Sequence, residues 1–152
     1  MKAVVVYESL WGNTARIARA TAEATAATIA DADLIVAGAP VLGFKLSSEK
    51  MRDSVRANPG KAPTPPDLSH PAMRVWLDAS PAGQGASAAF EARGRGPFGS
   101  AAPAIAEALE QAGYASVAKP VGFVVAGRFG PLRDGEVERA RAWGAELAAA
   151  LE

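Results

Sequence analysis

The sequence predicts an α/β domain in which helices cover both faces of a parallel sheet of four to five strands, giving three layers. Four short apolar runs are continuous rather than alternating, which is typical of strands covered on both faces. Segments with helical periodicity alternate with these runs, and right-handed crossovers would place helices on both faces. The predicted strands are residues 4–8, 34–37, 75–77 and 121–126.

Four helices are predicted, each from its own signals. The first occupies the run 15–20, directly after the loop that follows the first strand. The second follows a Ser-Ser-Glu sequence at 47–49, which offers an N-cap and an acidic first turn. The third covers 100–112, with a proline near its start and a glycine just after its end. The last runs from Glu136 to the C-terminus and has one apolar stripe with charges opposite.

Residues 58–71 (NPGKAPTPPDLSHP) contain five prolines in fourteen positions. Proline lacks a backbone N–H and fixes φ, so this stretch is neither a helix nor an inner strand. Because it follows a predicted helix and precedes a predicted strand, we expect an extended surface connection at the end of the sheet opposite the ligand site, with His70 at the surface. The alternative is a proline-rich peptide that docks to a partner domain.

The composition limits the classes of function. The chain has 152 residues, 49% of them hydrophobic, which predicts a single domain over residues 1–152. Sixteen basic and sixteen acidic residues give a formal net charge of zero, so we expect no binding to nucleic acid or membranes. The lack of cysteine and the single histidine exclude disulfides, thiolate ligands and a multi-histidine metal site. No apolar run is long enough for a signal-peptide core or a membrane span, so a cytoplasmic protein is expected. No Ser-His-Asp set or carboxylate pair is visible, and no catalytic residue is predicted.

The loop SLWGNT at residues 9–14 joins the first predicted strand to the first helix. A loop in that position presents unpaired backbone N–H groups, and the helix dipole favours an anion there. Gly12 permits close approach of the backbone, and three polar side chains add donors, whereas the loop contains no Lys or Arg. The sequence therefore predicts a phosphate-binding loop that uses neutral donors. The alternative is that Ser9, Asn13 and Thr14 only cap the helix.

The stretch VVVYESLWGNTARIA resembles the opening of flavodoxin-like proteins, in which the first strand ends in a Ser/Thr-x-x-Gly-Asn-Thr loop around the phosphate of FMN. DLIVAGAPVLGFKLS resembles their third strand with the loop beside the flavin, and GFVVAGRFGPLRDGEVERARAWGAELA resembles the last strand and final helix. The resemblance covers most of the chain and implies a flavodoxin-like three-layer sandwich with FMN as cofactor. The cofactor-binding residues that it implies are Ser9, Leu10, Trp11, Gly12, Asn13 and Thr14 at the phosphate, Pro40, Val41, Leu42, Gly43 and Phe44 on one side of the isoalloxazine ring, and, from residues 79–90, Ala79, Ser80, Gly83, Gly85 and Phe90 on the other.

The sequence departs from the flavodoxin pattern after the phosphate loop. Only eighteen residues, 15–32, precede the strand that begins near residue 33, too few for the family's two helices and intervening strand. A right-handed connection to the next strand would put the first helix on the face opposite to the family's. Three alternatives stay open: the helix changes faces, the crossover has an unusual hand, or residues of the natural polypeptide are missing around 20–27.

The predicted ring loops also depart from the family. Residues 78–90 contain no aromatic side chain before Phe90, so Phe44 and Trp11 are the nearest candidates for stacking on the ring. Many flavodoxins that carry electrons have strongly acidic surfaces. This chain has a net charge of zero, so its sequence does not predict docking to a partner through an acidic face.

The resemblance implies an FMN-binding electron-transfer protein, with polar or anionic surroundings that lower the flavin potential. One alternative is an FMN-dependent NAD(P)H:quinone-type reductase, favoured if Arg93 and Arg95 receive a phosphate or carboxylate beside an open ring face, or if the protein is a dimer or tetramer. A solvated turn is the other interpretation of both arginines. A second alternative is a flavin-free domain of the same fold that acts through protein partners. We expect a redox partner protein, or NAD(P)H and a quinone, and a monomer or homodimer.

Overall fold

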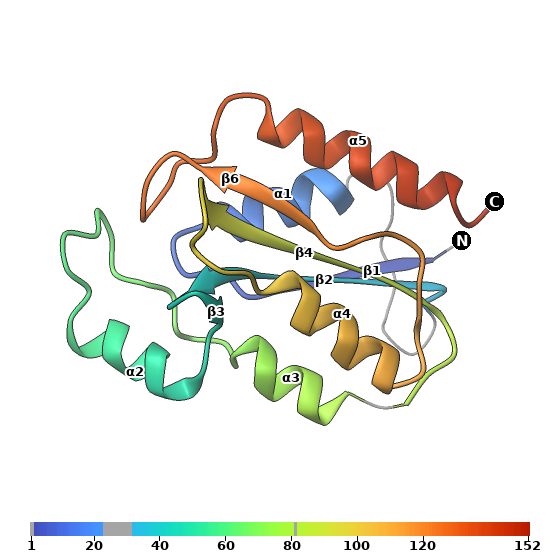
Figure 1. Ribbon diagram of the computed structural model, residues 1–152, viewed down its shortest axis with the longest axis horizontal. Helices are drawn as coiled ribbons and strands as arrows, with labels where there is room; N and C mark the ends of the chain where they lie inside the picture. The colour runs from blue at the N-terminus through green and yellow to red at the C-terminus, as the bar shows by residue number, and fades with distance from the viewer. Residues whose placement is uncertain (1, 23–31, 81) are drawn as a thin grey trace.

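The computed structural model describes residues 2–22, 32–80 and 82–152 (Figure 1). Within these ranges one sheet contains six strands. The parallel strands lie in the order β1, β2, β4, β6, and the short β5 pairs with β4 on the same edge as β6. A two-residue strand, β3, pairs antiparallel with the end of β2. The bounds are β1 (Ala3–Tyr7), β2 (Leu34–Leu42), β3 (Lys45–Leu46), β4 (Ala86–Gly94), β5 (Ala115–Ser116) and β6 (Val121–Val125).

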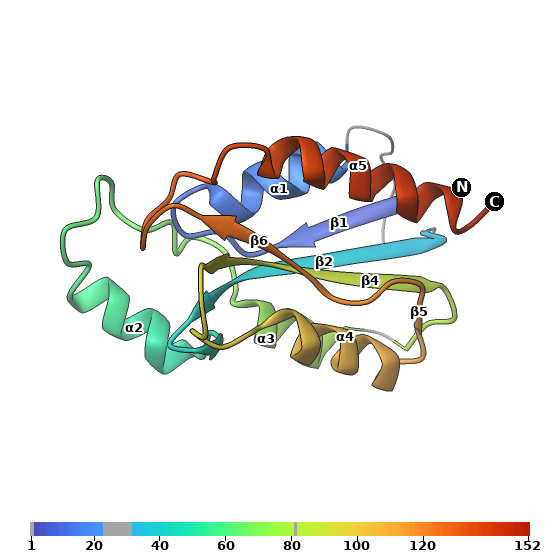
Figure 2. The ribbon, with the colours of Figure 1, turned by 45° about the horizontal axis from the view of Figure 1, so that its top comes forward.

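Helices cover both faces of the sheet, as Figure 2 shows. α1 (Asn13–Ala22) and α5 (Glu136–Ala149) pack together on one face, and α3 (Met73–Ala79) and α4 (Ala102–Gln111) lie on the other. α2 (Glu49–Ala57) lies beyond one end of the sheet, next to β3. The predicted fold class, an α/β sandwich with a parallel sheet, is therefore confirmed.

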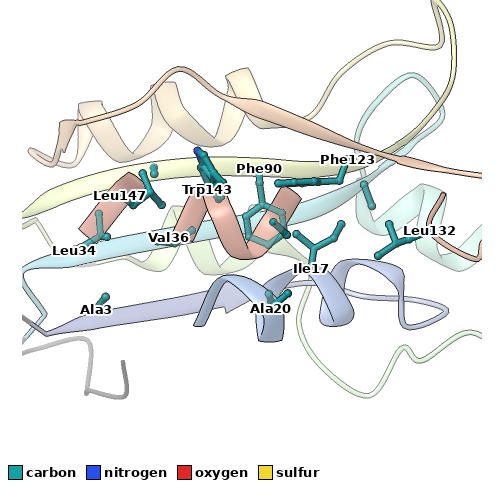
Figure 3. Packing of buried hydrophobic residues seen from close by; sticks show 14 of the residues in the cluster. Ala3, Ile17, Ala20, Leu34, Val36, Phe90, Phe123, Leu132, Trp143 and Leu147 are labelled. Carbon is teal, nitrogen blue, oxygen red and sulfur yellow. The ribbon is translucent and has the colours of Figure 1, made fainter. Parts of the chain in front are cut away.

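Two hydrophobic cores form because successive side chains of a strand point to opposite faces of the sheet. On the face of α1 and α5, the rings of Phe90, Phe123 and Trp143 meet edge to face with centroids 6.3, 6.1 and 6.0 Å apart (Figure 3). The core on the other face contains Ile35, Met73, Ala89, Ile105 and Leu109. Both faces of the inner strands are thus buried, which explains their continuous apolar sequence.

Predicted helix signals are confirmed at α2 and α4. The Ser48 hydroxyl caps α2 by accepting a hydrogen bond from the Met51 N–H at 3.3 Å. α4 has its proline in the first turn and is followed by Gly113, whose φ of +100° lies in the left-handed region. Residues next to these helix ends were therefore sufficient to predict where the helices begin or end.

The third predicted strand was wrong. Residues 75–77 lie in α3, and the inner strand is β4, eleven positions further along the chain at its start. Val75 is exposed, so this apolar run does not have the two buried faces of an inner strand. The sequence of β4, ASAAFEARG, is rich in small residues and lacks the β-branched residues that are typical of strands. Pairing on both edges, with β2 and β6, makes it a strand.

The first crossover differs from the later ones. The chain steps from β1 to β2 in the same direction across the sheet as from β4 to β6, yet α1 and α4 lie on opposite faces. The β1–α1–β2 connection is therefore opposite in hand to the β4–α4–β6 connection, although crossovers in such sheets are right-handed in about 98% of cases. α1 shares its face with α5, so the alternative in which the helix changes faces is not what the structure has. Residues 23–27 of the segment 20–27 lie outside the described residues, so the alternative of missing residues stays a prediction beside that of an unusual crossover.

The proline-rich connection lies at the carboxyl end of the sheet, so its predicted position was wrong. The Asp67 N–H donates to the Leu10 carbonyl at 2.8 Å, and the Trp11 ring N–H donates to the Thr64 carbonyl at 3.1 Å. His70 is half-buried, with Nε2 3.2 Å from the Ser9 carbonyl oxygen. The β2–β3 hairpin lies at the carboxyl end of the sheet, and α2 follows it in the chain. The proline-rich connection starts at the end of α2 and therefore passes along the loop between β1 and α1.

Candidate functional site

A cavity of about 660 Å³ lies at the carboxyl ends of the four parallel strands. This is where open α/β sheets place ligands, and the volume is within the ~300–1,000 Å³ usual for small-molecule sites. The residues that line it are Ser9, Leu10, Trp11, Asn13, Thr14, Pro40, Val41, Leu42, Gly43, Phe44, Ala92, Arg93, Gly94, Arg95, Phe98, Val125, Ala126, Gly127 and Arg128. The structure thus brings together the two segments predicted first, 9–14 and 40–44.

The loop between β1 and α1 is partly closed by its own serine. Ser9 Oγ accepts hydrogen bonds from the N–H groups of Gly12 and Ala15, both at 3.2 Å, so this hydroxyl does cap the helix. Within the described residues, the N–H groups of Trp11, Asn13 and Thr14 have no hydrogen-bond partner. Capping therefore accounts for the serine and leaves three amides at the start of α1 unpaired.

Two features of the same loop suit an anion. Within the described residues, Thr14 Oγ1 also has no hydrogen-bond partner, and its residue lines the cavity. Gly12 has φ +91°, and a Cβ built there would meet no atom within 4 Å, so its backbone borders open space. The donor set, backbone N–H groups plus a hydroxyl at a helix N-terminus, fits a phosphate without a cationic side chain.

Asn13 and Trp11 hold neighbouring segments. Asn13 Nδ2 donates to the Phe129 carbonyl at 3.1 Å, and the backbone of Gly130 packs so closely on this amide that a Cβ there would lie 2.3 Å from Asn13 Oδ1. The Trp11 ring meets Phe129 edge to face, with centroids 4.8 Å apart. The Asn13 side chain, predicted as a donor to the phosphate, is thus engaged with the β6–α5 loop, and Trp11 forms a fixed wall of the cavity.

Another part of the lining is the tight turn between β2 and β3. Gly43 and Phe44 form its two central residues with φ +60° and +69°, the positive pair that a two-residue hairpin of type I′ requires. Phe44 is 66% exposed and faces Phe98, which is 54% exposed, with ring centroids 6.4 Å apart. A bulky side chain at positive φ is strained, and such strain is concentrated at functional sites.

The charge of the cavity differs from the expectation. Its lining contains Arg93, Arg95 and Arg128 and no Asp or Glu. Arg93 Nη2 donates to the Gly96 carbonyl at 2.8 Å, and the Arg128 guanidinium lies 5.4 Å from the centre of the Phe129 ring. The expectation was polar or anionic surroundings. The charged side chains of this lining are cationic, so the anionic alternative does not describe it.

Two buried glutamates support the site, and sequence reasoning did not single out either of them. Glu8, at the end of β1, is 1% exposed and forms an ion pair with Arg52 at 3.1 Å. Glu91, in β4, is 3% exposed and accepts a hydrogen bond from Ser100 Oγ at 2.5 Å. A charged residue at the end of an apolar run is the signal that was available for Glu8. Glu91 lies in a strand that was not predicted.

The proline-rich connection carries one perturbed carboxyl group close to the site. Hydrogen bonds from the hydroxyl and N–H of Ser69 hold the pKa of Asp67 below its usual range. The carboxylate therefore stays ionised and closes this turn, while the Asp67 N–H binds the Leu10 carbonyl of the first loop.

The predicted second side of the ring site lies elsewhere. Ala79 and Ser80 lie at the end of α3, and Gly83 and Gly85 lie at the amino ends of the strands, where the Gly83 N–H donates to the Ala112 carbonyl at 2.9 Å. Phe90 is fully buried in the core. The misplaced strand caused this error, since taking 75–77 as a strand made 79–90 the loop after it. The loop after β4 begins instead near residue 95, and it brings Arg95 and Phe98 to the cavity.

No protein-family model matches the sequence, and no curated protein matches it. Solved structures do match in fold. Oxidised flavodoxin 1 from Bacillus cereus is 21% identical with a TM-score of 0.63, and the match covers 98% of each chain. A flavodoxin from the domain Archaea is 19% identical with a TM-score of 0.61, covering 98% of this chain and 97% of that one. The Flv1 flavodiiron core from Synechocystis sp. PCC6803 is 18% identical with a TM-score of 0.63, and this chain spans 36% of its length.

Within residues 2–22, 32–80 and 82–152, no helix has the length and apolar character needed to cross a membrane. The same part of the chain contains no group of three or more His, Asp or Glu side chains placed to hold a metal ion. The parallel sheet, the loops at its carboxyl edge and the matches over nearly the whole chain show that this protein has the flavodoxin-like fold.

Proposed function

We propose that the chain binds FMN non-covalently and carries electrons. The observation that carries this proposal is the donor set at the start of α1, where the N–H groups of Trp11, Asn13 and Thr14 border the cavity without partners among the described residues. Thr14 Oγ1 adds a hydroxyl, and Gly12 leaves the backbone open to close approach. A phosphate ester supplies the acceptor oxygens that such donors need.

The rest of the cavity suits a planar ring. Much of its lining is apolar and includes Pro40, Ala92 and Val125, which would exclude water from a bound ligand. Trp11 and Phe44 both line the cavity and offer aromatic surfaces. When bound, FMN would supply a ring that takes up one or two electrons. The chain's own part is to anchor the phosphate, enclose the ring and set its electrostatic surroundings.

The test compares FMN with riboflavin, which lacks the phosphate. Thr14→Val removes one donor to the anion and keeps the shape of the side chain, so it should weaken FMN binding about 10- to 100-fold, the equivalent of ~1.5–3 kcal/mol. Riboflavin binding should change little. The measurement is quenching of flavin fluorescence during titration of the purified, flavin-stripped protein.

Thr21→Val is the matched control, since it makes the same substitution two turns further along α1. Thr21 Oγ1 donates to the Ala140 carbonyl inside the protein at 3.4 Å, so this variant should lose some stability and keep its affinity for FMN. A wild-type protein that binds FMN no better than riboflavin would contradict the phosphate assignment. Equal FMN affinities of wild type and Thr14→Val would contradict it as well.

The charge of the cavity favours a second candidate, an FMN-dependent NAD(P)H:quinone-type reductase. Arg93 and Arg95 both line the cavity, where a phosphate or carboxylate of a second substrate would meet them. Bleaching of the bound flavin by NADPH alone, under anaerobic conditions, would support the reductase. Flavin that bleaches only when a partner reductase is added would support the electron carrier.

A third candidate from the sequence, a flavin-free domain that acts through protein partners, makes the opposite prediction. It requires that purified protein be colourless and have no measurable affinity for FMN. The proposed partner is a redox protein for the electron carrier, and NAD(P)H with a quinone for the reductase.

A further inference from the structure

Two loops that line the cavity are fastened to each other at one point. The turn between β2 and β3 carries Phe44, and the loop after β4 carries Phe98. The Phe44 carbonyl accepts a hydrogen bond from the Ser100 N–H at 3.2 Å. Gly99, at φ +83°, permits this approach, because a Cβ at its position would overlap the Phe44 carbonyl oxygen. The position of one loop therefore depends on the position of the other.

Glu91 holds this junction from inside the protein. Its Oε1 accepts hydrogen bonds from Ser100 Oγ at 2.5 Å and from the N–H groups of Ala101 and Ala102 at 3.3 and 3.1 Å. Ser100 thus donates to Glu91 through its side chain and to Phe44 through its backbone. Glu91 is 3% exposed, so solvent competes little for these hydrogen bonds.

Capping of α4 does not by itself account for Glu91. A serine or aspartate just before the helix would satisfy the same N–H groups without burying a carboxylate. Within the described residues, Glu91 Oε2 has no hydrogen-bond partner, and Arg93 Nη1, from a residue that lines the cavity, lies 3.9 Å away. The carboxylate is therefore linked to both cavity loops through Ser100 and lies near a third part of the lining.

We propose that Glu91 is a positioning residue that sets the distance between the β2–β3 turn and the loop after β4, and thereby the affinity of the cavity for the flavin ring. This inference rests on the proposed function and assigns the ring part of binding to a side chain that does not line the cavity. The phosphate corner lies on another loop, after β1. Loss of Glu91 should therefore weaken the ring contribution and leave the phosphate contribution unchanged.

The test measures the affinity of flavin-stripped protein for FMN and for riboflavin by quenching of flavin fluorescence. Glu91→Ala should weaken both about tenfold, so that the ratio of the two affinities stays as in wild type. Thr14→Val should change that ratio instead. Glu91→Gln keeps an oxygen for Ser100 and the two backbone N–H groups, so it should bind both flavins within about threefold of wild type. Wild-type riboflavin affinity in Glu91→Ala, or a Gln variant as weak as Ala, would overturn the proposal.

Two further variants separate positioning from a general loss of stability. Leu109→Ala truncates a fully buried side chain in the last turn of α4, so it should lower the melting temperature at least as much as Glu91→Ala and leave both affinities unchanged. Ser100→Ala removes the hydroxyl that joins Glu91 to the junction and should weaken both affinities about threefold. Flavin binding that falls as far in Leu109→Ala as in Glu91→Ala would overturn the positioning role.

A measurement without flavin keeps this proposal distinct from the proposed function. In flavin-free protein, amide hydrogen exchange in residues 43–46 and 95–100 should be about tenfold faster in Glu91→Ala than in wild type or Leu109→Ala. If no flavin binds to wild type, the proposed function fails, and faster exchange still shows that Glu91 positions the two loops. If FMN binds through Thr14 and riboflavin affinity does not depend on Glu91, the positioning role fails and the proposed function stands.

Discussion

Two buried glutamates at the carboxyl edge of the sheet cap helices that have no side-chain cap of their own. α3 begins after Ala72, and its first N–H, from Met73, donates to Glu8 at 3.3 Å. α4 begins after Ala101, and the N–H groups of Ala101 and Ala102 donate to Glu91 at 3.3 and 3.1 Å. In both places a strand supplies the acceptor that the helix sequence lacks.

The two corners differ in how completely the carboxylate is paired. Both oxygens of Glu8 accept hydrogen bonds, with Ser47 Oγ at 2.9 and 3.0 Å and Arg52 Nη1 at 3.1 Å from them. Glu91 uses only Oε1, while Oε2 is buried without a hydrogen-bond partner, and Arg93 Nη1 lies 3.9 Å away. Arg93 lines the cavity instead. The Glu8 carboxylate is thus fully paired inside the protein. The Glu91 carboxylate is only half paired, and the nearby cation, Arg93, lines the ligand cavity.

Glu8→Gln should break the fully paired corner and give the largest effect. The amide cannot accept from all the donors around it, and it leaves the buried Arg52 cation uncompensated. We expect the free energy of unfolding to fall by about 3–5 kcal/mol, measured by urea titration. The same substitution at Glu91 is the control, and a loss at Glu8 no greater than that at Glu91 would contradict the comparison.

Glu91→Ala should cost less, about 2–3 kcal/mol, because it removes the acceptor of the Ala101 and Ala102 N–H groups at the start of α4 and of Ser100 Oγ. Glu91→Gln keeps an oxygen for those donors and places its amide nitrogen where Oε2 has no hydrogen bond. It should therefore cost under about 1 kcal/mol. If Gln proved as damaging as Ala, the half-paired description of this corner would be refuted.

Glu136 offers a third carboxylate, nearer to solvent, that binds β6 to the start of α5. It accepts a hydrogen bond from the Val124 N–H at 2.6 Å and pairs with Arg139 at 2.8 Å. The hydrogen bond from Arg139 holds the pKa of Glu136 below its usual range, despite partial burial, which raises it. The stability that Glu136 contributes is therefore present above the pKa of the unfolded chain, about 4.3, and is lost as pH falls through the lower folded pKa.

Glu136→Gln should consequently lower the free energy of unfolding by about 1 kcal/mol at pH 7. The difference between wild type and variant should persist down to about pH 4.5 and shrink below it. Urea titrations at pH 7, 5 and 3 measure this. A difference that grows toward acid would have the wrong sign.

Phe44→Asn should give the smallest effect, and in the opposite direction. Asparagine tolerates positive φ, and the aromatic ring that it replaces is mostly exposed, so we expect a gain of about 0.5–1 kcal/mol. The measurement is thermal unfolding of Phe44→Asn and of Phe98→Asn. Both variants lose the contact between the two rings, but only Phe44→Asn removes a phenylalanine from a backbone position with positive φ. A destabilised Phe44→Asn would mean that the ring contributes more to folding than its exposure indicates.

Sequence patterns located most elements because they depend on local chemistry. The Ser48 cap, the glycine after α4 and the first loop were all readable from neighbouring residues. β4 was not, since its small residues become a strand only through pairing with β2 and β6. That single error moved half of the predicted ring site to the wrong end of the sheet and hid Phe98. The position of the proline-rich connection also depends on distant contacts, such as that between Trp11 and Thr64.

The proline-rich connection should affect both the rate of ligand association and the conformational entropy that binding costs. Its prolines restrict the chain before folding, and its contacts with Trp11 and Leu10 order one side of the entrance in advance. A preorganised wall has little freedom left to lose, so association should proceed without a slow closing step. Stopped-flow mixing should accordingly give a single phase whose rate rises linearly with ligand concentration.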